Sequence, residues 1–252
     1  MKQHLYIITG TSRGMGLAIA GQLLKPGNTL LCIARTTNEA LGVRASAVGA
    51  TLVQWSQDLA SGAQASARLK QWLSQQDGAS FTSATLINNA GVVPRIGPLS
   101  DADATDLAQA LRVGLEAPMQ LTAAFLGATQ GWATVVRKVL NISSGLGRRA
   151  MASQAAYCAA KAGMDHFTRC VALDEALKTN GAAVCSLAPG VINTDMQAQL
   201  RGADAMAFPD QGSFARLKAN DQLSSPAEAA ARVLAYLARP QFGADPVSDV
   251  RD

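Results

Sequence analysis

The chain has 252 residues, 48% of them hydrophobic, and its formal net charge at pH 7 is +4. This apolar content predicts one large globular domain over residues 1–252 and excludes an intrinsically disordered chain. Because the Lys and Arg residues are dispersed and aromatic residues make up only 5% of the chain, we expect no nucleic-acid partner.

Short apolar runs alternate with longer amphipathic stretches from one end of the chain to the other. In chain order we expect a strand at 5–9, a helix at 14–24, a strand at 29–34, a helix at 38–48, a strand at 51–55, a helix at 63–75, a strand at 84–88, a helix at 101–126, a strand at 133–143, a helix at 153–178, a strand at 182–188, a helix at 226–238 and an edge strand at 246–252. Such alternation implies right-handed crossovers and a parallel sheet. The predicted fold class is therefore α/β, a single doubly wound, Rossmann-type sheet with helices on both faces.

A glycine-rich turn, TGTSRGMG over residues 9–16, follows the first strand and opens the first helix. Glycine lets the backbone turn tightly and approach a pyrophosphate, whose charge is met by the N-terminus of the helix. Similar spacing also occurs in ordinary turns, but the strand–loop–helix context favours a nucleotide. The predicted cofactor contacts in this turn are Gly10, Ser12, Arg13, Gly14, Met15 and Gly16.

The end of the second strand carries Arg35 and no carboxylate that could bind a ribose 2′-hydroxyl. Arg35 and Arg13 could instead bind a 2′-phosphate through charge-assisted hydrogen bonds, which favours NADP(H) over NAD(H). The alternative is that both arginines are solvated loop residues. Asp58, after the third strand, either accepts a hydrogen bond from the adenine amino group or caps a loop or helix.

Tyr157 and Lys161 lie four residues apart, and Ser144 lies thirteen residues before the tyrosine. On a helix, positions i and i+4 share one face, so the ammonium group can stand beside the tyrosine hydroxyl. A positive charge there favours the phenolate, and we expect a lowered Tyr157 pKa. Such a tyrosine can pass a proton to a carbonyl oxygen that the serine holds, although the Tyr/Lys spacing alone occurs by chance in many helices.

Together these motifs resemble the short-chain dehydrogenase/reductase family over nearly the whole chain. The matching motifs are TGxxxGxG at 9–16, NNAG at 88–91, the set of Ser144, Tyr157 and Lys161, and Pro189-Gly190 followed by Thr194. Stretches such as Ala156-Tyr157-Cys158 look more like the benzil reductase and sepiapterin reductase branch than like the reductases of fatty-acid synthesis.

The resemblance implies a role for each matching position. Tyr157 would be the proton donor, Ser144 would orient the substrate carbonyl, and Lys161 would lower the tyrosine pKa and hold the nicotinamide ribose. Cofactor contacts are further implied for Asn88, Ala90 and Gly91 on the adenine ribose side, and for Pro189, Gly190, Val191 and Thr194, of which Val191 and Thr194 would hold the nicotinamide carboxamide.

One position departs from the family pattern. The family usually carries an asparagine in the long middle helix, where this chain reads Val113-Gly114-Leu115. That asparagine is thought to anchor a water that relays protons to the lysine. Another water could take the space left at Gly114, and a weakened enzyme, an engineered variant and a natural exception all remain open.

The substrate pocket is expected to be walled by Leu146, Arg148, Met151 and Gln154 and by residues 195–223, which form a mobile lid or an ordinary surface loop. The leading functional hypothesis is an NADPH-dependent carbonyl reductase acting on a benzil- or sepiapterin-like ketone or diketone. Alternatives are a reductase of 3-oxoacyl thioesters or steroids, and a weakly catalytic NADP-binding sensor, which Gly114 alone supports.

The remaining expectations concern the setting of the protein. Four scattered cysteines indicate reduced thiols in a cytoplasmic protein, and two isolated histidines predict no metal site. The sequence contains no run of about 18 apolar residues, so we expect no membrane span. The N-terminus enters a strand-like run at once, so we expect no signal peptide. The resemblance implies a homodimer or homotetramer, formed through the helices at 101–126 and 153–178.

Overall fold

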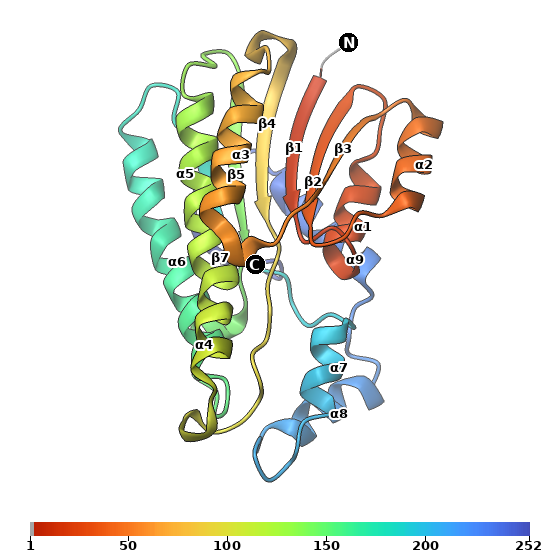
Figure 1. Ribbon diagram of the computed structural model, residues 1–252, viewed down its shortest axis with the longest axis vertical. Coiled ribbons are helices and arrows are strands. Elements are labelled where there is room, and N and C mark those ends of the chain that lie inside the picture. Colours follow the sequence, from red (N-terminus) through yellow and green to blue (C-terminus); the bar gives the residue numbers. More distant parts are fainter. Residues whose placement is uncertain (1–2) are drawn as a thin grey trace.

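A parallel sheet runs through the centre of the molecule in the computed structural model, which describes residues 3–252 (Figure 1). In these residues the sheet has seven strands in the order β3-β2-β1-β4-β5-β6-β7, every neighbouring pair being parallel. The strands are β1 (Gln3–Thr9), β2 (Asn28–Ala34), β3 (Thr51–Ser56), β4 (Phe81–Asn88), β5 (Val136–Ile142), β6 (Ala183–Ala188) and β7 (Val247–Asp249). The predicted doubly wound sheet is confirmed, and β7 lies at the edge where an edge strand was expected.

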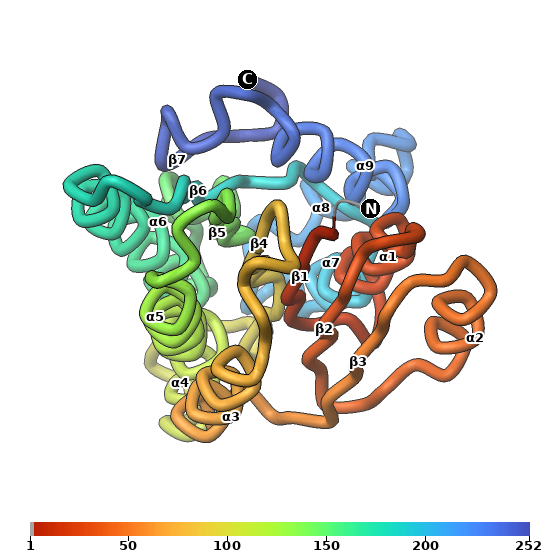
Figure 2. The backbone as a smooth tube through the Cα atoms, turned by 90° about the horizontal axis from the view of Figure 1, so that it is seen from above, coloured from red at the N-terminus to blue at the C-terminus, as the bar shows by residue number. Residues whose placement is uncertain are grey.

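Helices cover both faces of this sheet (Figure 2). The α-helices are α1 (Gly14–Leu23), α2 (Glu39–Val48), α3 (Gly62–Ser74), α4 (Ala104–Leu111), α5 (Ala117–Thr129), α6 (Ala155–Ala176), α7 (Asp195–Arg201), α8 (Gln211–Ala219) and α9 (Pro226–Leu237). Helices α3, α5 and α6 pack on one face, and α1, α2 and α9 pack on the other.

The sheet has a hydrophobic core on each face, and the alternating directions of the side chains along β1 show why. Leu5 and Ile7 belong to the core under α3 and α5, whereas Ile8 belongs to the core under α1 and α9. Successive side chains of a strand point to opposite faces, and a parallel strand covered on both faces is apolar in both directions. The apolar runs in the sequence are therefore strands, and their carboxyl ends form one edge of the sheet.

The long helical region expected at 101–126 is present, but it begins and ends about three residues later and contains an irregular turn. Asp103 caps α4 by accepting from the backbone N–H groups of Thr105 and Asp106 at 2.9 and 3.0 Å, so the helix begins after residue 103. Between α4 and α5, residues Arg112–Glu116 form a π-helical turn. Pro118 has no N–H to donate to the carbonyl of Gly114, four residues before it, which gives the local widening a physical cause.

The chain reverses its direction of winding between β1 and β4. From β1 it proceeds outward to β2 and β3, and then returns to the other side of β1 with β4. Ligands of open α/β sheets bind outside the carboxyl ends of the strands at such a switch point. Helices α7 and α8 lie beyond those ends, in the lower part of Figure 1. Across residues 3–252, the structure contains no helix of the length and apolarity that crossing a membrane requires.

Candidate active site

A cavity of about 530 Å³ opens along the carboxyl edge of the sheet. It extends from the end of β2 to the start of α6 and is bounded on one side by α7. Most residues that the sequence singled out line it: Gly10, Ser12, Arg13, Gly14, Met15, Gly16, Arg35, Asp58, Ala90, Gly91, Ser144, Leu146, Gln154, Tyr157, Lys161, Pro189, Gly190, Val191 and Thr194.

The glycine-rich turn is packed too closely for side chains. Gly10 has φ +74°, and a Cβ on it would lie 2.9 Å from the Cα of Ala90. A Cβ on Gly16 would lie 2.2 Å from the carbonyl oxygen of Gly10. Glycine at these two positions lets the backbone of the turn reach the cavity at the N-terminus of α1. This arrangement fits the pyrophosphate of a dinucleotide cofactor, because helix N–H groups and a bare backbone face the same space.

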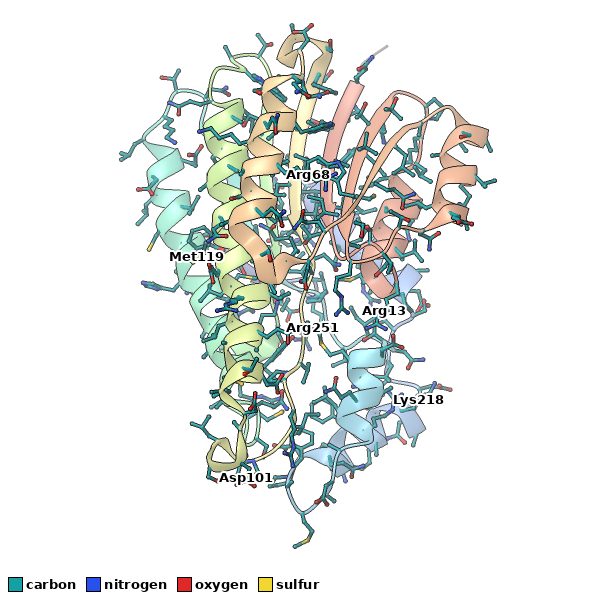
Figure 3. All side chains as sticks on the ribbon, in the orientation of Figure 1. Arg13, Arg68, Asp101, Met119, Lys218 and Arg251 are labelled. Carbon is teal, nitrogen blue, oxygen red and sulfur yellow. The ribbon has the colours of Figure 1, made fainter. Side chains whose placement is uncertain are left out.

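Charged residues lie at the end of the cavity nearest β2. Arg35 is exposed and lines the cavity. Arg13, labelled in Figure 3, pairs with Asp195 of α7 at 2.9 Å, and both side chains are largely exposed. Asp58 accepts from the backbone N–H of Ala60 at 2.9 Å and also lines the cavity, so its capping role and its access to a ligand coexist.

The predicted contact of Asn88 with the cofactor is wrong in its placement. Asn88 is 1% exposed and lies outside the cavity lining. Its amide donates to Thr122 at 3.2 Å and to Asn141 at 2.8 Å inside the protein. The neighbouring Asn89 lines the cavity instead, and its amide donates to the carbonyl of Thr9 at 2.9 Å, which joins β4 to the glycine-rich turn.

Ser144, Tyr157 and Lys161 meet at the inner end of the cavity. Ser144 follows β5, while Tyr157 and Lys161 lie on α6. Lys161 is 4% exposed, and its Nζ donates to the carbonyl of Ile142 at 2.7 Å. The same Nζ lies 5.8 Å from the centroid of the Tyr157 ring. The structure thus brings the three predicted catalytic side chains together around one space.

The electrostatics of the pair differ from the sequence expectation. Burial raises the pKa of Tyr157 above its ordinary value of 10.0, and this effect outweighs the hydrogen bond with Ser144, which lowers the pKa. Burial also lowers the Lys161 pKa from 10.5 to about 8. The expected lowering of the Tyr157 pKa by the lysine charge is therefore wrong for this structure, because loss of hydration acts more strongly on both groups.

Asp165 is a functional candidate that the sequence motifs did not indicate. It lies one turn after Lys161 on α6, is 2% exposed, and its charge opposes the burial effect on the Lys161 pKa. One carboxylate oxygen accepts from the hydroxyls of Ser143 and Ser186 at 2.5 and 2.7 Å. The spacing i, i+4 from Lys161 was the available signal, since it places both charges on one face of the helix.

The expected substrate wall is only partly correct. Leu146 and Gln154 line the cavity, whereas Met151 and Arg148 lie outside its lining. Arg148 turns toward the last strand, because its guanidinium donates to the carbonyl of Ser248 at 2.6 Å and to Asp165 at 3.4 Å. Met196 and Leu200, from the segment 195–223 that was expected to contribute to the pocket, line the cavity as well, and so do Val92, Val93 and Val113, which were not expected there.

Comparisons with known proteins agree with this architecture. The model of the short chain dehydrogenase family matches residues 4–205. The chain is 36% identical over 236 residues to the benzil reductase ((S)-benzoin forming) of Bacillus cereus, covering 94% of each protein. It is 31% identical over 207 residues to the sepiapterin reductase of Xenopus tropicalis, covering 78% of this chain and 77% of that protein.

A solved 3-oxoacyl-[acyl-carrier protein] reductase from Brucella melitensis in complex with NAD has a similar fold, with a TM-score of 0.81. The identity is 22%, and the match covers 99% of this chain and 96% of the other. The family match and the two reductases carry the assignment. The chain belongs to the short-chain dehydrogenase family and is an oxidoreductase that acts on carbonyl or alcohol groups.

Proposed function

We propose that this chain is an NADPH-dependent carbonyl reductase that acts on ketones and diketones of the kind that benzil reductases and sepiapterin reductases reduce. The observation that carries the proposal is the meeting of Ser144, Tyr157 and Lys161 in the same cavity onto which the glycine-rich turn opens. The benzil reductase of Bacillus cereus, similar over 94% of the chain, supports the choice of substrate class.

When bound, the nicotinamide would supply the hydride for the carbonyl carbon. Tyr157 donates its proton to the carbonyl oxygen, which the hydroxyl of Ser144 holds in place. A raised Tyr157 pKa keeps that proton on the hydroxyl at neutral pH, which suits a proton donor. Lys161 carries the compensating positive charge near the ring once the proton has left.

Preference for NADPH rests on the charges at the end of β2. Arg35 is exposed at the cavity, and the segment Ile33–Thr36 contains no carboxylate. A guanidinium can bind a 2′-phosphate through paired hydrogen bonds, whereas a ribose hydroxyl is normally held by an acid. The NAD bound in the Brucella melitensis structure supports a nicotinamide cofactor in general.

The segment 195–223 is proposed to act as a lid over the substrate. Met196 and Leu200 of α7 contribute apolar side chains to the cavity. The exposed ion pair between Arg13 and Asp195 links α7 to the glycine-rich turn. A cofactor phosphate that competes for Arg13 would loosen this link, so cofactor binding and lid position would be coupled.

The test is nicotinamide consumption, measured by absorbance, with NADPH and a panel of benzil, a pterin-side-chain ketone and an acetoacetyl thioester. We expect turnover on benzil or the pterin ketone, and Tyr157→Phe is expected to lower it by about 10²–10⁴-fold with an unchanged Kd for NADPH, because only the proton donor is removed. Absence of NADPH consumption on every member of the panel would overturn the proposal.

A further inference from the structure

The side chain of Gln154 is buried without a hydrogen-bond partner. It is 2% exposed, it lines the cavity, and within residues 3–252 neither Nε2 nor Oε1 has a partner in the protein. Asn88, Gln120 and Arg137 also leave one buried atom unpaired, but each of them bonds through another side-chain atom. Buried amides are normally paired, so a fully unpaired amide in a cavity indicates a ligand group that completes it.

The backbone around Gln154 is held in a strained conformation. Ser153, the preceding residue, has φ +62°, in the left-handed region that residues other than glycine rarely adopt. Its hydroxyl donates to the carbonyl of Ala207 at 2.6 Å, and its carbonyl accepts from the N–H of Gly97 at 3.4 Å. Strain of this kind persists only where the surroundings fix it, and it clusters at ligand sites.

Gln154 does not serve the helix that it precedes. It occupies the N-cap position of α6, yet its side chain makes no capping hydrogen bond. Only its backbone carbonyl is used, accepting from the N–H of Cys158 at 2.9 Å. Within the described residues the amide group therefore has no structural task, and Gln154 is one of the residues that line the cavity.

Gln154 also stands next to the reacting centre. It is the N-cap residue of α6, Tyr157 lies in the first turn of that helix, and both residues line the same cavity. A substrate oxygen bonded to the amide of Gln154 and one protonated by Tyr157 would therefore be neighbours, as are the two oxygens on adjacent carbons of a vicinal diketone.

We propose that Gln154 is a specificity-determining residue whose Nε2–H donates to the second carbonyl oxygen of a vicinal diketone while Tyr157 protonates the first. This inference rests on the proposed carbonyl reduction and names its substrate class. A simple ketone leaves the amide unpaired, so the site discriminates against it, as sites built around a polar group reject analogues that lack the matching group.

The decisive experiment compares benzil with deoxybenzoin, in which a methylene replaces the second carbonyl. Gln154→Met keeps the length of the side chain and removes its hydrogen bonds. We expect kcat/KM for benzil to fall about 10- to 100-fold and that for deoxybenzoin to change less than about threefold. The ratio of kcat/KM for benzil to that for deoxybenzoin is compared between the unaltered protein and Gln154→Met, which cancels the higher intrinsic reactivity of the diketone.

A second readout does not depend on turnover. Because the unpaired amide is unfavourable in the free protein, Gln154→Met is expected to raise the melting temperature without substrate. The same change at the exposed Gln71 on α3 serves as the control and is expected to leave both the substrate ratio and the melting temperature unchanged.

The outcomes separate the two proposals. The proposed role of Gln154 is overturned if Gln154→Met leaves the benzil-to-deoxybenzoin ratio of kcat/KM unchanged, or if it lowers the melting temperature. Either result would leave the proposed carbonyl reduction untouched. If the unaltered protein reduces neither ketone nor any other carbonyl of the panel, the proposed function fails and the role of Gln154 fails with it.

Discussion

Asp165→Asn offers a test of how the protein keeps a buried lysine charged. The carboxylate is 2% exposed and accepts hydrogen bonds from Ser143 and Ser186, with Arg148 3.4 Å away. Asparagine has nearly the same size but no charge. The substitution therefore removes the negative charge beside Lys161 and leaves the volume of the side chain in place.

The size of the effect follows from the helix geometry. Asp165 and Lys161 are related by i, i+4, which places their Cβ atoms about 6 Å apart. Taking the same separation for the two charges, an effective dielectric constant of about 20 gives an attraction of about 3 kcal/mol, equivalent to about two pH units. Burial already lowers the Lys161 pKa to about 8, and loss of the Asp165 charge lowers it further.

The sign of the activity change is then fixed. If the ammonium form of Lys161 supports proton transfer, activity falls as pH rises through the lysine pKa, and in Asp165→Asn this fall begins up to about two pH units lower. The assay is kcat for benzil reduction between pH 6 and pH 10. The exposed Asp174 on the same helix provides the control variant Asp174→Asn, which is expected to follow the unaltered protein.

A folded Asp165→Asn variant with the same alkaline limb as the unaltered protein would refute this role of Asp165. A uniform loss of kcat at every pH would refute it as well, because it would indicate that Asp165 only holds the hydroxyls of Ser143 and Ser186. Circular dichroism at each pH establishes that the variant is folded, since loss of a buried acceptor costs about 1–3 kcal/mol.

Three further predictions concern the cofactor-free stability, the cofactor preference and the π-helical turn. The pKa of Lys161 is about 8 in the folded protein and about 10.5 in the unfolded chain, so the unfolded chain binds more protons between these pH values. The free energy of unfolding is therefore expected to rise with pH in this range, by up to about 3 kcal/mol. Urea unfolding of Lys161→Met, measured over the same pH range, should lack this rise. Arg35→Ala is expected to raise the KM for NADPH about tenfold or more with little change for NADH in steady-state assays, whereas equal changes for both would contradict a 2′-phosphate contact. Gly114→Ala is expected to lower the free energy of unfolding by about 1–2 kcal/mol, because the added Cβ would lie 3.2 Å from the Cβ of Ala160 and this crowding exceeds the gain in helix propensity. Ala160→Gly in the same chain should recover part of the loss in a double-mutant cycle.

The fold could be predicted because buried parallel strands leave a strong signal. Apolar runs bounded by turns coincide with the strands to within three residues or so at each end. The late start and the π-helical turn of the middle helix arose from local chemistry inside an amphipathic stretch. Asp103 forms the cap at which the helix begins, and Pro118 cannot complete the hydrogen bond to the carbonyl of Gly114.

The sequence predicted the parts of the candidate site that depend on the path of the backbone better than the parts that depend on the direction of a side chain. The glycine-rich turn and the ends of the strands lie where the motifs placed them. Asn88 and Asn89 are neighbours, but only Asn89 faces the cavity, since adjacent residues at the end of a strand point to opposite sides. Arg148 pairs with β7, a partner 100 residues away that no local pattern could indicate. The expected homodimer or homotetramer stays a prediction.

The lack of a side chain at Gly114 affects the packing of the π-helical turn against α6. A Cβ on Gly114 would lie 3.2 Å from the Cβ of Ala160, and Gly163 lies against Leu115 on the same side of α6. Small residues on both elements thus let the π-helical turn approach the helix that carries Lys161. A larger side chain at 114 would push on the residue just before this lysine, whose ammonium is held by the carbonyl of Ile142. Restoring the usual family residue with Gly114→Asn should therefore lower kcat rather than raise it, and a rise in kcat would show that proton transfer, not packing, limits this site.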